Sequence, residues 1–213
     1  MKRLFSPVFF VILVALVVSG CGSTSSPTDT PLPPTATSAP TDTPAPTDTP
    51  PPPTPIPVVF ELTSPAFNAG EAIPVRYSCD GENISPPLEW SDPPPNTQSF
   101  ALILEDPDAV GVVGYIWDHW IIFNLPAETR ALPEAIPPDA ELSDGSRHGQ
   151  NSWQRLDYGG PCPPEGTHRY FFKLYALDTG LDLAAGASKE QLRQTMEGHI
   201  LAQTELMGLY TNQ

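Results

Sequence analysis

Three short polar motifs hold the side chains of this sequence that are best suited to binding or catalysis, and each borders an apolar segment. Residues 106–108 (Asp-Pro-Asp) follow one apolar run, and residues 117–120 (Trp-Asp-His-Trp) begin the next. In residues 159–172 a proline-rich loop leads to His168 and Tyr170. Side chains from distant segments converge on pockets at the ends of strands. Carboxylates and imidazoles that meet there can bind a small anion, act as a base or hold a metal ion.

Several enzyme and metal-site templates do not fit these motifs. The segment from Asp106 begins like a calcium-binding EF-hand loop, but Val110 and Trp117 stand where ligands are needed. Residues 145–149 lack the spacing of a nucleophile elbow, and the sequence has no phosphate-binding glycine loop of the Walker type. We therefore predict a non-catalytic protein without a metal or other cofactor. A metal site formed by Asp106 and two histidines remains the alternative.

The elements that must position these motifs are predicted to be mainly strands, because short apolar or alternating segments are bounded by Pro, Gly, Asn and Asp. Residues 100–104 are continuously apolar, so we predict a central strand that is covered on both faces. Ser188 and Gln191 form a capping box, and the apolar spacing after them predicts a helix that continues to about Met207. The expected strands cover residues 60–63, 74–77, 99–105, 117–124 and 168–177.

The first 20 residues have the composition of a signal peptide. Lys2 and Arg3 precede an apolar run over residues 8–18, which is short for a membrane-spanning helix. The run ends in Ser-Gly followed by Cys21, a pattern that resembles the lipobox of bacterial lipoproteins, in which the cysteine thiol is acylated after cleavage. We therefore expect an exported protein that is anchored to a bacterial membrane by a lipid on Cys21. An ordinary secretory signal is the alternative.

Residues 21–57 are predicted to be a disordered stalk. They consist almost entirely of Pro, Thr, Ser, Ala and Asp, and the unit Pro-Thr-Asp-Thr-Pro occurs three times. Such a segment has almost no apolar surface to bury, so it cannot offset the entropy lost on ordering. Its proline content favours an extended chain that spans on the order of 100 Å.

Residues 58–213 are predicted to form one domain. Eight basic and 22 acidic residues give it a formal charge of −14 with histidines neutral. This charge argues against nucleic-acid binding and against binding to an anionic membrane surface. If Cys21 is acylated, Cys79 and Cys162 remain as a pair, and an exported location favours a disulfide between them. Two buried free thiols are the alternative.

Five segments resemble the bacterial branch of the phosphatidylethanolamine-binding protein family, which also includes the animal Raf kinase inhibitor proteins. In chain order they read YSCDGENISPPLEW, LEDPDA, WDHW, GGPCPPEGTHRYFFKLYALD and MEGHILAQTELMGLY. The resemblance covers residues 60–210. It implies a mainly β fold of two antiparallel sheets with Greek-key connections and peripheral helices, and the helix predicted near the C-terminus would be one of them.

The resemblance also implies a small pocket that binds phosphate-like or carboxylate groups. Val110 departs from the proline that the family often has after Asp-Pro-Asp-Ala, which leaves the turn after Asp108 in doubt. The ligand-binding residues carried over to matching positions are Asp106, Asp108, Trp117, His119, Pro161, His168 and Tyr170.

Roles for these residues follow from their chemistry. The prolines of the loop are expected to hold it rigid before a ligand arrives. His168 is expected to donate an N–H to the anion, while Asp106 accepts a hydrogen bond from a histidine ring and raises the pKa of that histidine. Arg169 alternates to the other face of its strand, where we expect a structural ion pair. His148 and His199 are assigned structural roles.

The leading functional hypothesis is a lipid-anchored binding module whose pocket takes phosphate-type ligands or phospholipid head groups. One alternative is an inhibitor of a protease or another protein partner. The other is a weak hydrolase or metal-dependent enzyme that uses Asp106, His119 and His168, although no nucleophile with an orienting partner is recognisable.

Overall fold

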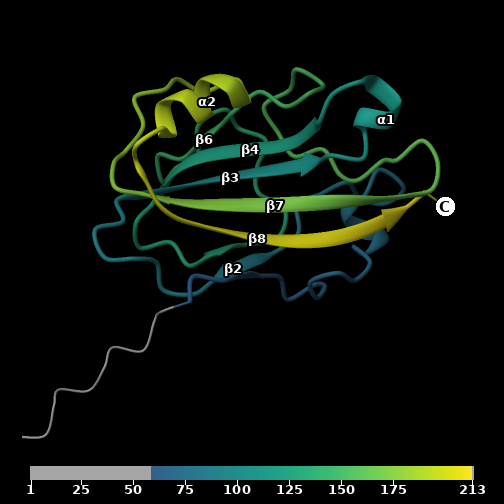
Figure 1. Cartoon of the computed structure of the whole chain (residues 1–213), viewed down its shortest axis with the longest axis horizontal. Coiled ribbons are helices and arrows are strands. Elements are labelled where there is room, and N and C mark those ends of the chain that lie inside the picture. The colour runs from purple at the N-terminus through teal and green to yellow at the C-terminus, as the bar shows by residue number, and fades with distance from the viewer. Residues whose placement is uncertain (1–58, 213) are drawn as a thin grey trace, which may run out of the picture. The chain divides into compact units, whose positions relative to one another are not determined.

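The computed structural model describes residues 59–212, so the predicted signal peptide, Cys21 and the stalk lie outside the described residues. Two antiparallel sheets form most of this domain (Figure 1). The larger sheet has the order β6-β4-β3-β7-β8, and these strands are Arg147–His148, Trp117–Pro126, Ser99–Asp106, Thr167–Leu177 and Ile200–Thr211. The smaller sheet has the order β1-β2-β5, formed by Leu62–Thr63, Leu88–Trp90 and Ala131–Leu132. The fold is mainly β, as predicted.

Four strands of the larger sheet are connected as a Greek key. β4 pairs with β3, β6 pairs with β4, and the chain then returns so that β7 pairs with the other side of β3. The resulting spatial order, β7-β3-β4-β6, is the Greek-key pattern of one returning strand beside three earlier ones, with β5 of the smaller sheet between β4 and β6 in the chain. The return places the start of β7 beside the end of β3, whose other neighbour there is the start of β4. All three polar motifs therefore meet at one end of the sheet.

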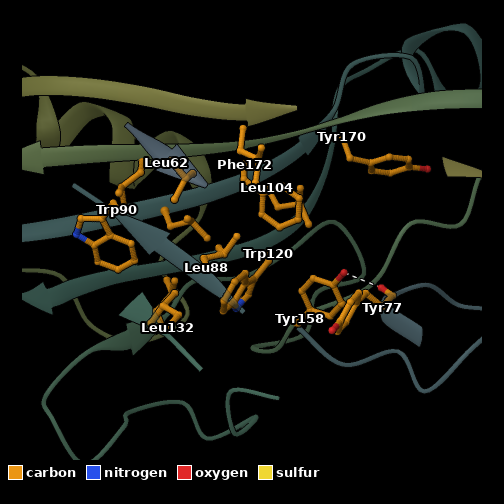
Figure 2. Packing of buried hydrophobic residues seen from close by; sticks show 14 of the residues in the cluster. Leu62, Tyr77, Leu88, Trp90, Leu104, Trp120, Leu132, Tyr158, Tyr170 and Phe172 are labelled. Atoms are coloured by element: carbon orange, nitrogen blue, oxygen red, sulfur yellow. Dashed lines mark hydrogen bonds between the residues drawn. The ribbon is translucent and has the colours of Figure 1, made fainter. Parts of the chain in front are cut away.

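β3 lies at the centre of the apolar core. Every residue from Phe100 to Leu104 is fully buried. Phe100, Leu102 and Leu104 pack with apolar side chains of the smaller sheet, some of which Figure 2 shows. Ala101 and Ile103 pack with the apolar side of the helix α2 (Lys189–Met196). Because α2 and β2 lie on opposite faces of the larger sheet (Figure 1), the predicted central strand is confirmed.

The helix near the C-terminus is shorter than predicted. It begins with the expected capping box, in which the Gln191 N–H donates to Ser188 Oγ, but it ends at Met196 instead of near Met207. Gly198 has a φ of +81°, a left-handed conformation that stops a helix. The residues that follow form β8, which pairs with β7 along its whole length. Pairing with a long neighbouring strand thus overrides the helical spacing of the apolar residues.

Other differences concern short elements. Residues 74–77 were expected to form a strand, but Val75–Tyr77 form a turn of 3-10 helix that the Tyr77 N–H closes on the Pro74 carbonyl at 3.0 Å. The expected strand at residues 60–63 is reduced to β1. The strands β2, β5 and β6 and the one-turn helix α1 (Val110–Val113) were not predicted, because two to four residues show no period. No helix within residues 59–212 has the length and apolar character to cross a membrane.

Candidate functional site

A cavity of about 270 Å³ lies where the three polar motifs meet. Antiparallel pairing sets Asp106 of β3 opposite Trp117 of β4, and it sets Glu105 opposite Phe171 of β7. α1 lies at the same end of the sheet (Figure 1). The cavity is lined by Asp106, Ala109, Val112, Val113, Trp117, His119, Trp153, Cys162, Pro164 and His168. Four predicted site residues are therefore in the wall, namely Asp106, Trp117, His119 and His168.

Asp108 and Pro161, two of the other three predicted site residues, do not line the cavity. Asp108 Oδ1 and Oδ2 accept hydrogen bonds from Arg169 Nη2 at 2.6 Å and Nε at 2.9 Å, and this guanidinium lowers the pKa of Asp108 to about 2. The ion pair predicted for Arg169 is thus present, and both carboxylate oxygens of Asp108 take part in it. Pro161 is buried, and its carbonyl accepts the Cys79 N–H at 3.0 Å. Cys162 and Pro164 face the cavity in its place.

Asp106 is held by three hydrogen bonds. Its Oδ1 accepts the backbone N–H groups of Asp108 and Ala109 at 2.9 and 3.1 Å, a turn that follows directly from the Asp-Pro-Asp sequence. Its Oδ2 lies 2.7 Å from Nδ1 of His168, which donates to the carboxylate. Both side chains are buried. The predicted contact between Asp106 and a histidine is therefore made by His168, whose remaining ring nitrogen is Nε2.

His119 reaches the cavity because β4 contains a bulge. Leu104 pairs with Trp120 and Glu105 pairs with Asp118, so His119 has no partner on β3. A bulged residue breaks the alternation of faces and redirects its own side chain. His119 and Trp120 consequently share the face of the smaller sheet, while Asp118 points to the α2 face and pairs with Lys189. The sequence motif gave no sign of this extra residue.

The ring of His119 is fixed in one tautomer. Its Nδ1 lies 2.8 Å from the Gly159 carbonyl and 3.1 Å from the Gly160 carbonyl. Carbonyl oxygens only accept, so Nδ1 carries the proton. Burial lowers the pKa of His119 to about 4, despite the opposing effects of these carbonyls and of Asp106. His119 is therefore neutral near pH 7, and its Nε2 is left as an acceptor.

The loop that holds His119 needs two glycines. A Cβ on Gly159 would meet the ring of Trp153 at 2.4 Å, and one on Gly160 would meet the Tyr77 carbonyl at 2.3 Å. The Gly160 N–H donates to Asn83 Oδ1 at 2.7 Å, which fixes the loop to the preceding segment. This close packing explains why the motif begins Gly-Gly.

The predicted disulfide between Cys79 and Cys162 is present. The two Cα atoms are 5.4 Å apart, although 83 residues separate the cysteines in the sequence. The bridge attaches the loop with the two glycines to the turn after Val75–Tyr77. Because Cys162 also lines the cavity, the disulfide forms part of the candidate site.

Two buried donors near the cavity have no protein partner. Tyr170, the last predicted site residue, does not line the cavity either; it is fully buried behind His119, with the ring centroids 5.2 Å apart and nearly perpendicular. Its hydroxyl has no hydrogen-bond partner in the described chain and points away from Leu104 and Phe172 (Figure 2). Burial, and then the charge of Asp106, raises the pKa of Tyr170, so the hydroxyl keeps its proton. Trp117 Nε1 is likewise buried without a partner among residues 59–212.

Trp153 is the main lining residue that the sequence analysis missed. Its ring packs edge-on against Trp117 and His119, with centroid distances of 5.2 and 5.0 Å. It belongs to the long connection between β6 and β7, where no periodic pattern marks it. A tryptophan in an otherwise polar loop was the only available signal.

The described residues offer no ready metal centre. Within residues 59–212 no group of three or more His, Cys, Asp or Glu side chains is arranged to hold a metal ion. Both oxygens of Asp106 and the Nδ1 atoms of His119 and His168 already have protein partners.

Comparison with known proteins agrees with this geometry. The sequence profile of the phosphatidylethanolamine-binding protein family matches residues 63–211. A UPF0098 protein of Methanothermobacter thermautotrophicus is 54% identical over 149 residues, which cover 70% of this chain and 97% of the relative. A UPF0098 protein of Aquifex aeolicus is 46% identical over 156 residues, which cover 71% of this chain and 88% of the relative.

Two crystal structures are similar over the domain. One is a phosphatidylethanolamine-binding protein homolog, CT736, from Chlamydia trachomatis, with a TM-score of 0.66 and 42% identity, covering 72% of this chain and 98% of that one. The other is Escherichia coli YbcL, described as a member of the mammalian family, with a TM-score of 0.66 and 31% identity, covering 72% and 99%. The chain therefore belongs to the phosphatidylethanolamine-binding protein family.

Proposed function

We propose that the cavity at the end of the larger sheet binds a small oxyanion, such as a phosphate-type group, and that the domain is a binding module and not an enzyme. The observation that carries the proposal is the set of buried polar side chains, Asp106, His119 and His168, around a cavity whose other walls are mainly apolar. Pockets with a few converging polar groups in apolar walls are typical ligand sites.

The available hydrogen-bonding groups suit an oxyanion. Tyr170 Oη and Trp117 Nε1 are buried donors without partners in the described chain, and such groups are costly to leave unpaired. His168 donates from Nε2 when it is protonated, because Nδ1 is engaged by Asp106. His168 and Trp117 line the cavity, so oxygen atoms of a bound anion would accept from them, while Tyr170 lies behind this wall.

The chemistry of the wall favours binding over catalysis. The lining residues include no Ser, Thr or Lys, and Cys162 is held in a disulfide. His119 and His168 thus have no nucleophile to activate within the lining. Apolar groups such as Val112, Val113 and Trp153 exclude water but offer no reactive atoms.

Titration with inorganic phosphate tests the binding proposal. The full-length protein in a mild detergent is expected to give saturable heat in calorimetry and a saturable shift of the histidine ring signals in NMR. His168→Ala is expected to abolish most of the binding. His199→Ala is the matched control, because His199 is exposed, pairs with Asp178 and lies outside the cavity. Equal binding by wild type and His168→Ala would contradict the proposal.

We further propose that the domain is exported and anchored to a membrane through a lipid on Cys21. The signal-like residues 1–20 and the lipobox pattern support this, and so does the disulfide, since disulfides persist mainly in oxidising compartments. Cys21→Ser is expected to move the protein from the detergent phase to the aqueous phase in partitioning, or to leave it as an unprocessed precursor. Partitioning equal to wild type would exclude the lipid anchor.

A further inference from the structure

We propose that the cavity selects oxyanions that carry a hydroxyl group of their own, namely hydrogen phosphate and phosphomonoesters, over sulfate esters and phosphodiesters. This inference rests on the proposed anion-binding function and names the ligand class. Its basis is that His119 offers the ligand an acceptor and not a donor.

The position of the His119 proton is set by the fold. Nδ1 donates to the carbonyls of Gly159 and Gly160, and neither oxygen can take the opposite role. The loop that bears these carbonyls cannot shift easily, because Asn83 holds the Gly160 N–H and the disulfide at Cys162 holds the next turn. Nε2 is therefore the lone-pair end of the ring, since both hydrogen bonds of the His119 ring within residues 59–212 are made by Nδ1.

Protonation of Nε2 is a poor alternative. The His119 side chain is 2% exposed and lies edge-on against Trp153 and Tyr170. The titratable groups that face it are Asp106 on β3 and His168 and Tyr170 on β7. Burial lowers the pKa of His119 despite the nearby Asp106, which agrees with a neutral ring. A ligand must therefore bring the proton for this hydrogen bond.

Asp106 strengthens the same requirement. Its carboxylate lines the cavity, and its partners are His168 Nδ1 at 2.7 Å and two backbone N–H groups, with no Lys or Arg side chain in the lining. A fully ionised ligand would meet this negative charge, whereas a ligand that keeps one proton carries less charge and can donate. Trp117, which lines the cavity and whose Nε1 has no partner among residues 59–212, remains as a donor for the other oxygens. The cavity thus matches a group with one hydroxyl and several acceptor oxygens.

A ligand without a hydroxyl leaves Nε2 buried and unpaired. An unpaired buried acceptor lowers affinity by about tenfold or more. Sites built to hydrogen-bond a ligand hydroxyl reject analogues that lack it far more strongly than sites that differ by one methylene. We therefore expect selectivity to appear between ligands of equal size and charge.

The matched pair of probes is O-phosphoethanolamine and 2-aminoethyl hydrogen sulfate. At about pH 5.5 the phosphomonoester retains one hydroxyl, because its second pKa is about 6, and it then has the same charge as the sulfate ester. Calorimetry on the full-length protein in detergent is expected to give a sulfate-ester affinity at least about tenfold lower. Glycerophosphoethanolamine, a diester of the same head group, is expected to be rejected like the sulfate.

The outcomes separate the two proposals. Similar affinities for the phosphate and sulfate esters would overturn the selectivity and leave the anion site standing. Absence of binding by both esters and by inorganic phosphate would overturn both proposals. Tighter binding of the diester than of the monoester would also overturn the selectivity.

Two variants test whether the selectivity comes from His119. His119→Phe removes the acceptor, so the affinity ratio of phosphate to sulfate ester is expected to fall to about one. Trp117→Phe removes a donor of the cavity wall that has no partner among residues 59–212, so both affinities are expected to fall while their ratio is retained. If His119→Phe fails to fold, the wild-type ratio still decides the proposal.

The same chemistry is available from a lipid or from a free metabolite. Short-chain dihexanoyl phosphatidic acid is a lipid phosphomonoester, and dihexanoyl phosphatidylethanolamine is the matching diester. Binding of the phosphatidic acid more tightly than O-phosphoethanolamine would identify a lipid source, whereas the reverse order would identify a free phosphomonoester. A preference for the phosphatidylethanolamine would contradict the proposal.

Discussion

Glu105 and Asp106 are consecutive residues of β3, and both residues are 3% exposed, yet their surroundings differ. Glu105 points to the α2 face, where Lys173 Nζ lies 2.6 Å from one oxygen and Lys189 Nζ lies 3.4 Å from the other, with Arg193 at 3.9 Å. Asp106 points to the opposite face, where His168 and two backbone N–H groups are its partners beside a cavity.

The comparison teaches that burial of a carboxylate does not by itself mark a binding site. Burial alone would raise the pKa of Glu105, but Lys173, Lys189 and Arg193 outweigh it, so the pKa is lowered and the charge is fully matched. On the face of Asp106, by contrast, polar atoms of His119, Tyr170 and Trp117 lack protein partners among residues 59–212. Unmatched polar atoms around a cavity distinguish the candidate site from a structural ion cluster.

The largest expected effect is on the stability of the domain and comes from the disulfide beside the cavity. Reduction, or the double substitution Cys79→Ser and Cys162→Ser, is expected to lower the free energy of unfolding by about 4–5 kcal/mol, because the bridge closes a loop of 83 residues. Denaturant titration with and without reductant measures this difference. Phosphate affinity should fall too, since Cys162 lines the cavity, and an unchanged affinity would show that the loop keeps its shape unaided.

As the pH falls, the first loss of stability should also come from the cavity side of the sheet, through protonation of His119. His119 has a pKa of about 4 in the folded protein and about 6.5 when unfolded, so the unfolded chain binds the proton more tightly between these values. Stability is therefore complete above about pH 6.5 and is expected to decrease by about 3 kcal/mol as the pH falls to about 4. Glu105 has a lowered pKa in the folded protein. Its contribution to stability is therefore lost only at lower pH, as the pH falls below the ordinary pKa of a glutamate and then through the pKa of folded Glu105.

Thermal unfolding across pH 4–7 checks this order. The decrease should be smaller in His119→Phe than in wild type, whatever the starting stability of the variant. His148 also has a pKa lowered by burial, so it contributes in the same direction to both proteins and cancels in the comparison. Parallel curves for the two proteins would show that His119 is not the group responsible.

Exchanging the two carboxylates for amides sharpens the contrast between stability and binding. Glu105→Gln is expected to destabilise the protein by about 1–3 kcal/mol, since it removes the buried charge that Lys173 and Arg193 face, and to leave phosphate affinity unchanged. Asp106→Asn should weaken phosphate binding, because the amide no longer positions and polarises His168. Loss of phosphate binding in Glu105→Gln would mean that the two faces are coupled.

The smallest effect is expected for Asp108→Asn. Asp108 is paired with Arg169 outside the cavity wall, so phosphate affinity should change less than about twofold, within the range of a surface ion pair. Calorimetry of this variant beside Asp106→Asn makes the comparison. A loss as large as that of Asp106→Asn would place Asp108 in the site after all.

The parts of the fold that the sequence predicted depend on local chemistry. The apolar run 100–104 identified the central strand, and the Asp-Pro-Asp turn and the alternation of β7 placed Asp106, His168 and Arg169 correctly. The helix beyond Met196 was predicted wrongly, because its apolar spacing is compatible with both a helix and the strand β8, and only pairing with β7 decides between them.

The features of the site that the sequence did not predict depend on contacts between distant segments. The tautomer and lowered pKa of His119 follow from carbonyls 40 and 41 residues away, which no local pattern reports. Trp153 lies in a loop whose apolar residues have no regular spacing. Asp108 does not line the cavity because it pairs with Arg169, 61 residues away. Resemblance to the family supplied the right segments, whereas the roles of individual atoms needed the structure.

The bulge at His119 makes the site sensitive to the length of the chain as well as to its composition. If Trp117 were deleted and β4 then paired regularly with β3, His119 would lie opposite Glu105 and Asp118 would lie opposite Asp106, so each side chain would move to the other face of the sheet. The histidine would then enter the cation cluster around Glu105, and the acid of position 118 would enter the cavity. In evolution or design, an insertion or deletion here therefore has two results at once: it removes the acceptor from one face and unbalances the charge of the other.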